Sequence, residues 1–330
     1  MSPAPLRRLP PATLLFLVCL TAVTLSACTA GTPEPSAVAS DTEPGQPANA
    51  RVVVTADFGE DVLLDVTVAL ADGTTAIEAL DSVAELETSY GACFVESING
   101  VGGTGGKVDW FYYINGMLGD VGSCDYVLCD GDVQHWDYHD WRFRRDVTAT
   151  LGAFPHAFLR GYGGAVRPTT IVCDTRFTAE AASIADSLMG AGATDVTVTS
   201  QDELAEAAKE THNLVIVSAI DNSLVSELYG IRDRVGLFTS SEDSTLITYD
   251  YDGTVDGTFG AGSGVVEAMQ NPWNPRGTGA CENVVVLVTG TDDEGVRSAV
   301  DALALEWGDM ELWPAAIVED GMASPVPRRN

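Results

Sequence analysis

The segment from Asp109 to Tyr138 constrains the fold most, because two tight-turn signals lie between strand-forming runs. Trp110 to Ile114 is a run of aromatic and β-branched residues, which suit a pleated and half-buried surface. Asn115-Gly116 follows directly, and this pair tolerates the positive φ angles of a type I′ turn. Asp130-Gly131 gives the same signal further along the chain. The segment therefore predicts a β-meander.

The period of two along the first of these strands divides its large side chains between two faces. Trp110, Tyr112 and Ile114 lie on one face, and Phe111 and Tyr113 lie on the other. One of these faces can belong to the core. The second face is either buried as well or forms an exposed platform, and large exposed apolar patches mark interaction sites.

Three motifs in this region are typical of a known family and occur in its order. They are Tyr113-Ile-Asn-Gly116, Gly122-Ser-Cys-Asp-Tyr126 and Asp130-Gly-Asp-Val-Gln-His-Trp136. With them, residues 52–138 resemble the transcobalamin-like C-terminal domain, also called DUF4430. The resemblance implies a small β-grasp-like domain. In the vitamin B12 carriers of animals this domain closes over one side of a corrinoid, while a separate helical domain, which no part of this chain resembles, holds the other side.

The resemblance also implies a ligand site formed by stacking aromatic rings and by hydrogen bonds from the turn backbone. The expected ligand-binding residues are Trp110, Tyr113, Asn115, Gly116, Leu118, Gly122, Ser123, Tyr126 and Trp136. We therefore predict a ligand-binding lipoprotein that captures cobalamin or another corrinoid and delivers it to a membrane importer. The alternative is a cell-envelope interaction protein whose β-rich domain binds a protein or polysaccharide partner.

The first residues have the layout of a secretory signal. Arg7 and Arg8 precede an apolar run, from Leu14 to Leu25, that is short for a membrane span. Leu25-Ser-Ala-Cys28 resembles a bacterial lipobox, with Cys28 as the lipidated residue. An uncleaved signal anchor, the alternative, would need a longer apolar stretch. We expect the protein on the extracytoplasmic face of the bacterial cell membrane, held there by its lipid anchor.

The chain is strongly acidic, with a formal net charge of −31. Such a surface repels phosphate backbones and anionic headgroups, so binding to nucleic acid or to the lipid surface is not expected. The charge serves either solubility outside the cell or the attraction of cations. The acidic stretch after Tyr249 lacks the terminal Glu of a calcium loop, because Ala261 stands at the twelfth position from Asp250, and it is interpreted as a turn-rich loop.

Beyond residue 168 the chain alternates strand and helix patterns. Strands are expected at Thr170–Cys173, Val196–Val198, Leu214–Ser218 and Asn283–Thr289, with helices after Thr178, Ser200 and Thr291. The predicted fold class is α/β plus α+β, in which a small β-grasp-like domain precedes an open α/β sandwich with a mainly parallel sheet. The expected division is a signal peptide at 1–27, the lipidated Cys28 and a disordered tether at 28–50, a β-rich DUF4430 domain at 51–140, a connector at 141–167, an α/β domain at 168–320 and a tail at 321–330.

Catalytic motifs are sparse, so we predict no enzymatic activity, no metal site and no resident cofactor. His135 and His139 are either ligands for a metal ion or a corrinoid cobalt, or satisfied surface side chains. Gly260–Gly264 departs from a dinucleotide-binding fingerprint. Thr289–Asp292 either holds an anion at a helix N-terminus or is an ordinary helix cap.

Seven cysteines occur in the chain, of which Cys19 leaves with the signal and Cys28 takes lipid. The other five are expected to meet an oxidising compartment, where structural disulfides persist. Cys173 and Cys281 adjoin strands of the second domain and are a possible pair. The sequence leaves open which of the remaining three stays unpaired, Cys93, Cys124 or Cys129.

Overall fold

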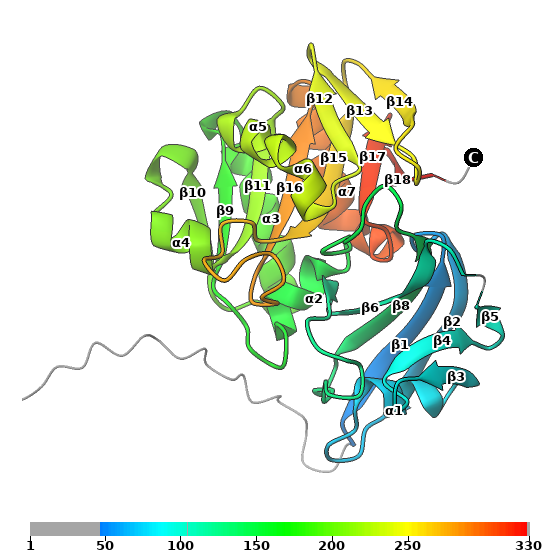
Figure 1. Ribbon diagram of the computed structural model, residues 1–330. Helices are drawn as coiled ribbons and strands as arrows, with labels where there is room; N and C mark the ends of the chain where they lie inside the picture. Colours follow the sequence, from blue (N-terminus) through cyan, green and yellow to red (C-terminus); the bar gives the residue numbers. More distant parts are fainter. Residues whose placement is uncertain (1–46, 104, 329–330) are drawn as a thin grey trace, which may run out of the picture. The chain divides into compact units, whose positions relative to one another are not determined.

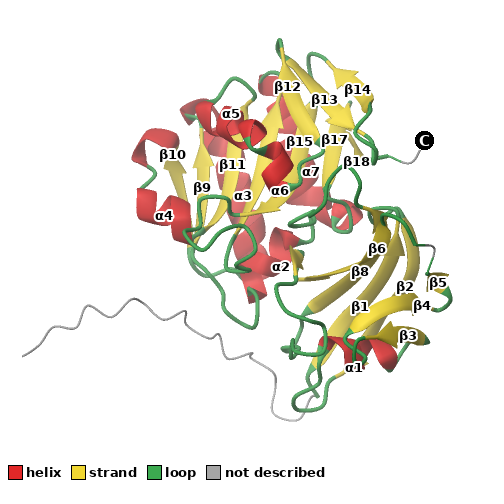
Figure 2. Ribbon diagram, viewed as in Figure 1, coloured by secondary structure: helices red, strands yellow, loops and turns green. Residues whose placement is uncertain are grey.

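The computed structural model describes residues 47–103 and 105–328 (Figure 1). The predicted signal peptide, the predicted lipidation site Cys28 and the first part of the predicted tether lie outside these residues. Within them, no helix has both the length and the apolar character needed to cross a membrane. The two largest sheets are a five-stranded sheet before residue 141 and a seven-stranded sheet after residue 168 (Figure 2).

The five-stranded sheet has the order β2-β1-β8-β6-β7. Its strands are β1 (Asn49–Ala56), β2 (Asp61–Ala69), β6 (Val108–Ile114), β7 (Met117–Leu118) and β8 (Val133–Asp140). Only the β1–β8 pair is parallel, and the other three pairs are antiparallel. Asn115 and Gly116 have φ angles of 49° and 77° and turn β6 into β7, which confirms the first predicted tight turn.

Helix α1 (Ala76–Asp81) covers one face of this sheet (Figure 1). Thr75 and Glu78 form a capping box at its start. Trp110, Ile114 and Trp136 pack with the helix in one apolar cluster. A smaller antiparallel sheet lies beside it and contains β3 (Leu86–Ser89), β4 (Phe94–Ile98) and β5 (Val101–Gly102).

The seven-stranded sheet has the order β10-β9-β11-β16-β15-β17-β18. Its strands are β9 (Thr169–Cys173), β10 (Val196–Ser200), β11 (Asn213–Ala219), β15 (Gly264–Gln270), β16 (Val284–Gly290), β17 (Ala315–Glu319) and β18 (Met322–Val326). The four strands from β10 to β16 are parallel to one another. The three pairs from β16 to β18 are antiparallel.

The prediction of a mainly parallel α/β sandwich is therefore wrong. The described residues contain 18 strands and 7 α-helices, and the sheets are mixed or antiparallel. The four expected strands are present and mutually parallel, but β15, β17 and β18 were not predicted from the sequence. Asp320 and Gly321, with φ angles of 49° and 74°, join β17 to β18 by a tight turn, which forces an antiparallel pair.

Helices and a small sheet cover the two faces of the seven-stranded sheet (Figures 1 and 2). One face carries α2 (Ala153–Arg160), α3 (Thr178–Ala191) and α7 (Asp293–Met310). The other carries α5 (Ser223–Gly230), α6 (Arg232–Val235) and the antiparallel strands β12 (Thr239–Glu242), β13 (Thr245–Tyr249) and β14 (Val255–Phe259). The predicted apolar stripe of α3 is confirmed, since Ala181, Ile184, Ala185 and Leu188 are all buried.

The helix after Ser200 is displaced from its expected start. A short 3₁₀ helix, η2 (Gln201–Glu203), follows β10, and α4 (Glu206–Thr211) begins only afterwards. Ser200 Oγ bonds the Glu203 carboxylate at 3.1 Å, but it caps no backbone N–H. The capping box was therefore a wrong prediction at this position.

Residues 141–167, expected as a connector, contain α2 and contact both large sheets. The Gly116 turn packs so closely on this segment that a Cβ atom at Gly116 would lie 2.0 Å from the Ala153 nitrogen. Gln270 on β15 donates a hydrogen bond to the Leu118 carbonyl at 3.1 Å. Arg51 on β1 pairs with Glu311, which follows α7, at 2.6 Å. The two sheet regions are thus joined by partly buried polar contacts as well as by close packing.

Candidate functional site

The strand order creates a crevice at one edge of the seven-stranded sheet. From β9 the chain passes through α3 to β10 on one side, and from β10 it returns through α4 to β11 on the other side of β9. The connections therefore diverge at β9. In open sheets with parallel strands, ligands bind at the carboxyl ends of the strands where this divergence occurs.

A cavity of about 440 Å³ lies at this position. Its residues come from the segments that directly follow the three adjacent strands β9, β10 and β11. They are Cys173, Asp174, Thr175, Arg176, Ser200, Gln201, Asp202, Asp221 and Asn222, and we call this the switch-point cavity. Its volume lies within the range of roughly 300–1,000 Å³ that is common for ligand sites.

The floor of the switch-point cavity is a closed network of side-chain hydrogen bonds. The Asp174 carboxylate accepts hydrogen bonds from Ser218 Oγ at 2.7 Å and from Asn222 Nδ2 at 2.9 Å. Asn222 Nδ2 also donates to Gln201 Oε1 at 2.7 Å, while its Oδ1 accepts from the Leu224 N–H at the start of α5. These bonds fix the side chains before any ligand arrives, which lowers the entropic cost of binding.

The wall of the cavity carries more negative than positive charge. Arg176 is its one cation, and its guanidinium lies 3.6 Å from Asp174 and 3.8 Å from Asp221 and also pairs with Asp293 at 2.8 Å. Within the described part of the chain, Asp202 has no hydrogen bond or ion pair. The cavity therefore offers carboxylate and amide oxygens to a ligand that is rich in hydrogen-bond donors.

The side chains that line the switch-point cavity are mainly hydrogen-bonding groups. No histidine lines it, and burial raises the pKa of the Cys173 thiol, which disfavours the reactive thiolate. This site was not predicted from the sequence, although the strands that build it were. Asp174 directly follows one predicted strand and Asp221-Asn222 closely follows another, and polar residues at these positions were the available signal.

Most residues of the expected ligand site are enclosed by protein. Tyr113 and Asn115 are at most 1% exposed. Among the others, Leu118 is half-buried, Gly116 packs against α2 and only Gly122 is exposed. The remaining buried members are Trp110, Ser123, Tyr126 and Trp136. None of the nine lines the switch-point cavity.

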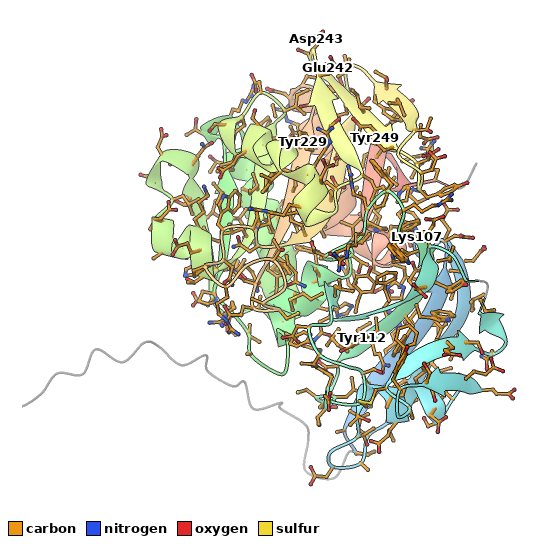
Figure 3. The ribbon with its side chains drawn as sticks, viewed as in Figure 1. Lys107, Tyr112, Tyr229, Glu242, Asp243 and Tyr249 are labelled. Atoms are coloured by element: carbon orange, nitrogen blue, oxygen red, sulfur yellow. A yellow bond between two sulfur atoms is a disulfide. The ribbon has the colours of Figure 1, made fainter. Side chains whose placement is uncertain are left out.

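The second aromatic face is also covered, so it does not form an exposed platform. Tyr113 stacks on His135, and Phe111 stacks on His139 with ring centroids 4.3 Å apart. On the α1 face, Tyr112 stacks on Trp136, and Figure 3 shows Tyr112 on the five-stranded sheet. The strand therefore uses both of its faces for packing.

Asn115 holds the turn between β6 and β7 in place. Its side-chain nitrogen donates to Asp132 Oδ1 and to the Gly161 carbonyl, each at 2.8 Å. Its side-chain oxygen accepts from the Val133 N–H at 2.9 Å. Burial raises the pKa of the Asp132 carboxyl. A ligand would contact the Asn115 side chain only if this network opened.

His135 and His139 lie on the same face of β8 with Asp137 between them, and neither is a surface side chain. Thr55 Oγ1 donates to Asp137 at 2.5 Å, so the 2.7 Å contact between Thr55 and His135 requires His135 to donate from Nε2. Burial lowers the pKa of His135 to about 4. No group of three or more metal-ligating side chains occurs within residues 47–103 and 105–328.

The cysteine pairing differs from one expectation. Cys93 and Cys124 form a disulfide, which settles the open choice among the three cysteines of the first region. Cys173 and Cys281 are both free and buried, so the suggested pair between them is wrong. The Cys281 thiol instead donates a hydrogen bond to the Leu118 carbonyl at 3.0 Å. Cys281 is therefore part of the contact between the two sheet regions.

The segment before α7 is an ordinary helix cap, as one of the two alternatives predicted. Asp292 Oδ1 accepts hydrogen bonds from the N–H groups of Glu294 and Gly295. These backbone hydrogen bonds, with a further one from Gly262, lower the pKa of Asp292. The carboxylate thus occupies the place that a bound anion would take. Gly264 and Gly290 serve close packing against the same helix start, where a Cβ atom would lie 2.3 Å from its backbone.

Comparison with known proteins identifies one part of the chain. Residues 73–140 match the family described as Domain of unknown function (DUF4430). The predicted family resemblance is confirmed for these residues, which we call the DUF4430 region. The description of the family assigns no activity. A search of curated proteins finds no match for the chain.

Proposed function

We propose that this protein is an extracytoplasmic ligand-binding lipoprotein whose ligand occupies the switch-point cavity. The observation that carries the proposal is a preformed cavity of about 440 Å³ at the carboxyl ends of β9, β10 and β11. Its hydrogen-bonded floor suits reversible binding. The signal peptide and Cys28 support a lipid anchor outside the cell membrane.

In its finer form the proposal is the capture of cobalamin or another corrinoid for delivery to a membrane importer. The support is the match of residues 73–140 to DUF4430, together with the family resemblance. A corrinoid is larger than the drug-sized ligands that pockets of this volume enclose, so most of it would project from the switch-point cavity. Hydroxyl and amide groups at its edge would supply donors to Asp202 and Asp221.

A second candidate function is attachment to a polysaccharide or protein of the cell envelope. It is favoured by an exposed aromatic pair between β3 and β4. Tyr90 is 89% exposed and Phe94 is 44% exposed, with ring centroids 6.2 Å apart. The Cys93–Cys124 disulfide braces this turn. Rigid, exposed aromatic side chains are common anchors of binding surfaces.

The test is calorimetric titration of the full chain in detergent with dicyanocobinamide, cyanocobalamin and soluble cell-wall oligosaccharides. Replacement of Asp202 and Asp221 by Asn removes two carboxylates from the cavity without disturbing its floor. The matched control changes Glu242→Gln and Asp243→Asn, which lie at the tip of the β12–β13 hairpin (Figure 3). Loss of binding by at least tenfold in the first double variant alone supports the proposal.

Two results would contradict it. If a ligand binds both double variants equally, its site is elsewhere. If binding instead fails with Tyr90→Ala and Phe94→Ala, the envelope-attachment function takes first place.

A further inference from the structure

A second cavity lies where the five-stranded sheet region meets the seven-stranded sheet region. It has a volume of about 320 Å³. Five chain segments line it, and their residues are Asp57, Phe58, Val108, Asp140, Arg142, Tyr251, Pro327 and Arg328. We call it the junction cavity. Boundaries between structural regions are frequent places for small-molecule sites, and this site shares no residue with the switch-point cavity.

The turn after β1 is held in a strained conformation beside the junction cavity. Asp57, Phe58 and Gly59 have φ angles of 55°, 61° and 86°, and the first two are not glycine. Asp137 stabilises this turn by accepting hydrogen bonds from the N–H groups of Phe58 and Gly59, at 3.1 and 3.0 Å. Left-handed backbone at non-glycine residues costs free energy and is often found where a binding site requires a fixed side chain.

The strained turn fixes Phe58 as an immobile wall of the junction cavity. The Phe58 ring stacks on His139 with centroids 4.4 Å apart and meets Phe238 edge-on at 5.2 Å. Gly59 permits the close approach to the seven-stranded sheet region, since a Cβ atom there would lie 2.2 Å from the Leu312 carbonyl oxygen. With Val108, Pro327 and the Tyr251 ring, Phe58 supplies the apolar part of the cavity lining.

The two arginines of the junction cavity differ in what they contact. The Arg142 Nε atom lies 3.0 and 2.7 Å from the two carboxylate oxygens of Asp140, and the guanidinium stands 5.8 Å from the Tyr251 ring centroid. Arg142 is therefore already neutralised. Arg328 has no hydrogen bond or ion pair among the residues that the structure describes. Arg328 is therefore the cation of the cavity that is available to pair with a negatively charged ligand.

We propose that the junction cavity binds a small organic monoanion: an apolar, ring-sized body with one carboxylate. The body would lie between Phe58 and Tyr251, and the carboxylate would meet the guanidinium of Arg328, whose planar fork matches its geometry. Arg328 is a single cation, so a dianion such as a phosphate ester would bring a second negative charge into the site without a partner. The volume, near the lower end for ligand sites, excludes large bodies. This site is independent of the function proposed above.

The test compares two probes that differ only in charge. The full chain in detergent is titrated with 3-phenylpropionate and with 3-phenylpropanamide, which has the same body but no carboxylate. We expect the acid to bind at least tenfold more tightly than the amide. Arg328→Gln is expected to weaken binding of the acid at least tenfold and to leave binding of the amide unchanged. Tyr251→Ala is expected to weaken both.

Arg145→Gln is the matched control, because Arg145 is 85% exposed and does not line the cavity. Circular dichroism of each variant separates loss of binding from loss of fold. Equal affinity for acid and amide would overturn the proposal. So would full binding by a folded Arg328→Gln variant, or the absence of acid binding at millimolar concentration.

Discussion

Oδ2 of Asp137 lies 2.6 Å from Nδ1 of His139, and both side chains are at most 3% exposed. The same carboxylate accepts hydrogen bonds from Thr55 Oγ1 and from two backbone N–H groups of the strained turn after β1. Burial opposes ionisation of Asp137, but the hydrogen bond with His139, the histidine charges and the hydrogen bond from Thr55 lower its pKa. One buried anion therefore connects β8, β1 and the turn between β1 and β2, which packs closely against Leu312.

Replacing Asp137 with Asn is expected to lower the free energy of unfolding by about 3 kcal/mol, because charge-assisted hydrogen bonds of buried groups are lost. The amide can still accept on one side, but its NH₂ group faces donors on the other. Urea unfolding measures the loss. Asp243→Asn, at an exposed hairpin tip, is the control and is expected to change stability by less than about 0.5 kcal/mol. A loss below about 1 kcal/mol for Asp137→Asn would show that the turn does not depend on the carboxylate.

His135 is expected to make the fold less stable in mild acid. Its pKa is lowered to about 4 by burial, whereas an unfolded chain takes up the proton near pH 6.5. Between these values the unfolded state binds more protons, so stability falls as the pH falls from 6.5 to 4. The loss amounts to about 3 kcal/mol, since one pKa unit corresponds to about 1.4 kcal/mol. Urea unfolding of His135→Gln across this range should show a shallower dependence on pH, and an unchanged slope would count against the assignment.

Glu267 is expected to act in the opposite direction. It lies fully buried on β15 and accepts hydrogen bonds from the Phe238 N–H at 2.7 Å and from Thr239 Oγ1 at 2.5 Å. Burial raises its pKa to about 7, so the folded state keeps a proton that the unfolded state releases near pH 4.5. Stability therefore decreases as the pH rises from 4.5 to 7.

The measurement is the difference in unfolding free energy between Glu267→Gln and the parent chain. This difference should shift in favour of the variant by about 3 kcal/mol from pH 4.5 to 7.5. Because His135 and Glu267 have opposing slopes, the parent chain alone would show little dependence near pH 5.5. A difference that stays constant with pH would mean that Glu267 is ionised in both states.

Local patterns were sufficient to predict the elements whose signals lie within a few residues. The Asn115-Gly116 turn, the buried parallel strands and the apolar stripe of α3 all follow from turn chemistry and periodicity. The antiparallel half of the second sheet was not predictable in this way. Its strand β15 is fully buried and includes Glu267 and Gln270, and only tertiary partners explain polar residues at these positions.

The candidate site also depends on tertiary contacts that local sequence patterns do not reveal. Asp174 and Asn222 are 48 positions apart and converge only because β9 and β11 are neighbours. The aromatic hairpin, in contrast, carried a strong family pattern, and that pattern gave no indication that a second region of the chain would cover it. Gly161, whose carbonyl accepts a hydrogen bond from Asn115, lies 46 positions after Asn115 in the chain. It belongs to the segment that was expected to be a connector.

Asn115→Ala therefore tests whether the hairpin motif is structural. The change leaves the Val133 N–H and the Gly161 carbonyl without partners and places alanine at a φ of 49°, so we expect a loss of about 4 kcal/mol in unfolding free energy. Gly122→Ala is the matched control from the same predicted site, because Gly122 is exposed and a Cβ atom there has no contact under 3.4 Å. Its expected effect is below about 0.5 kcal/mol. Urea unfolding gives both values. A different result would contradict this structural role. If Asn115→Ala is as stable as the control but loses affinity for a corrinoid, Asn115 serves ligand binding and not the packing of the hairpin.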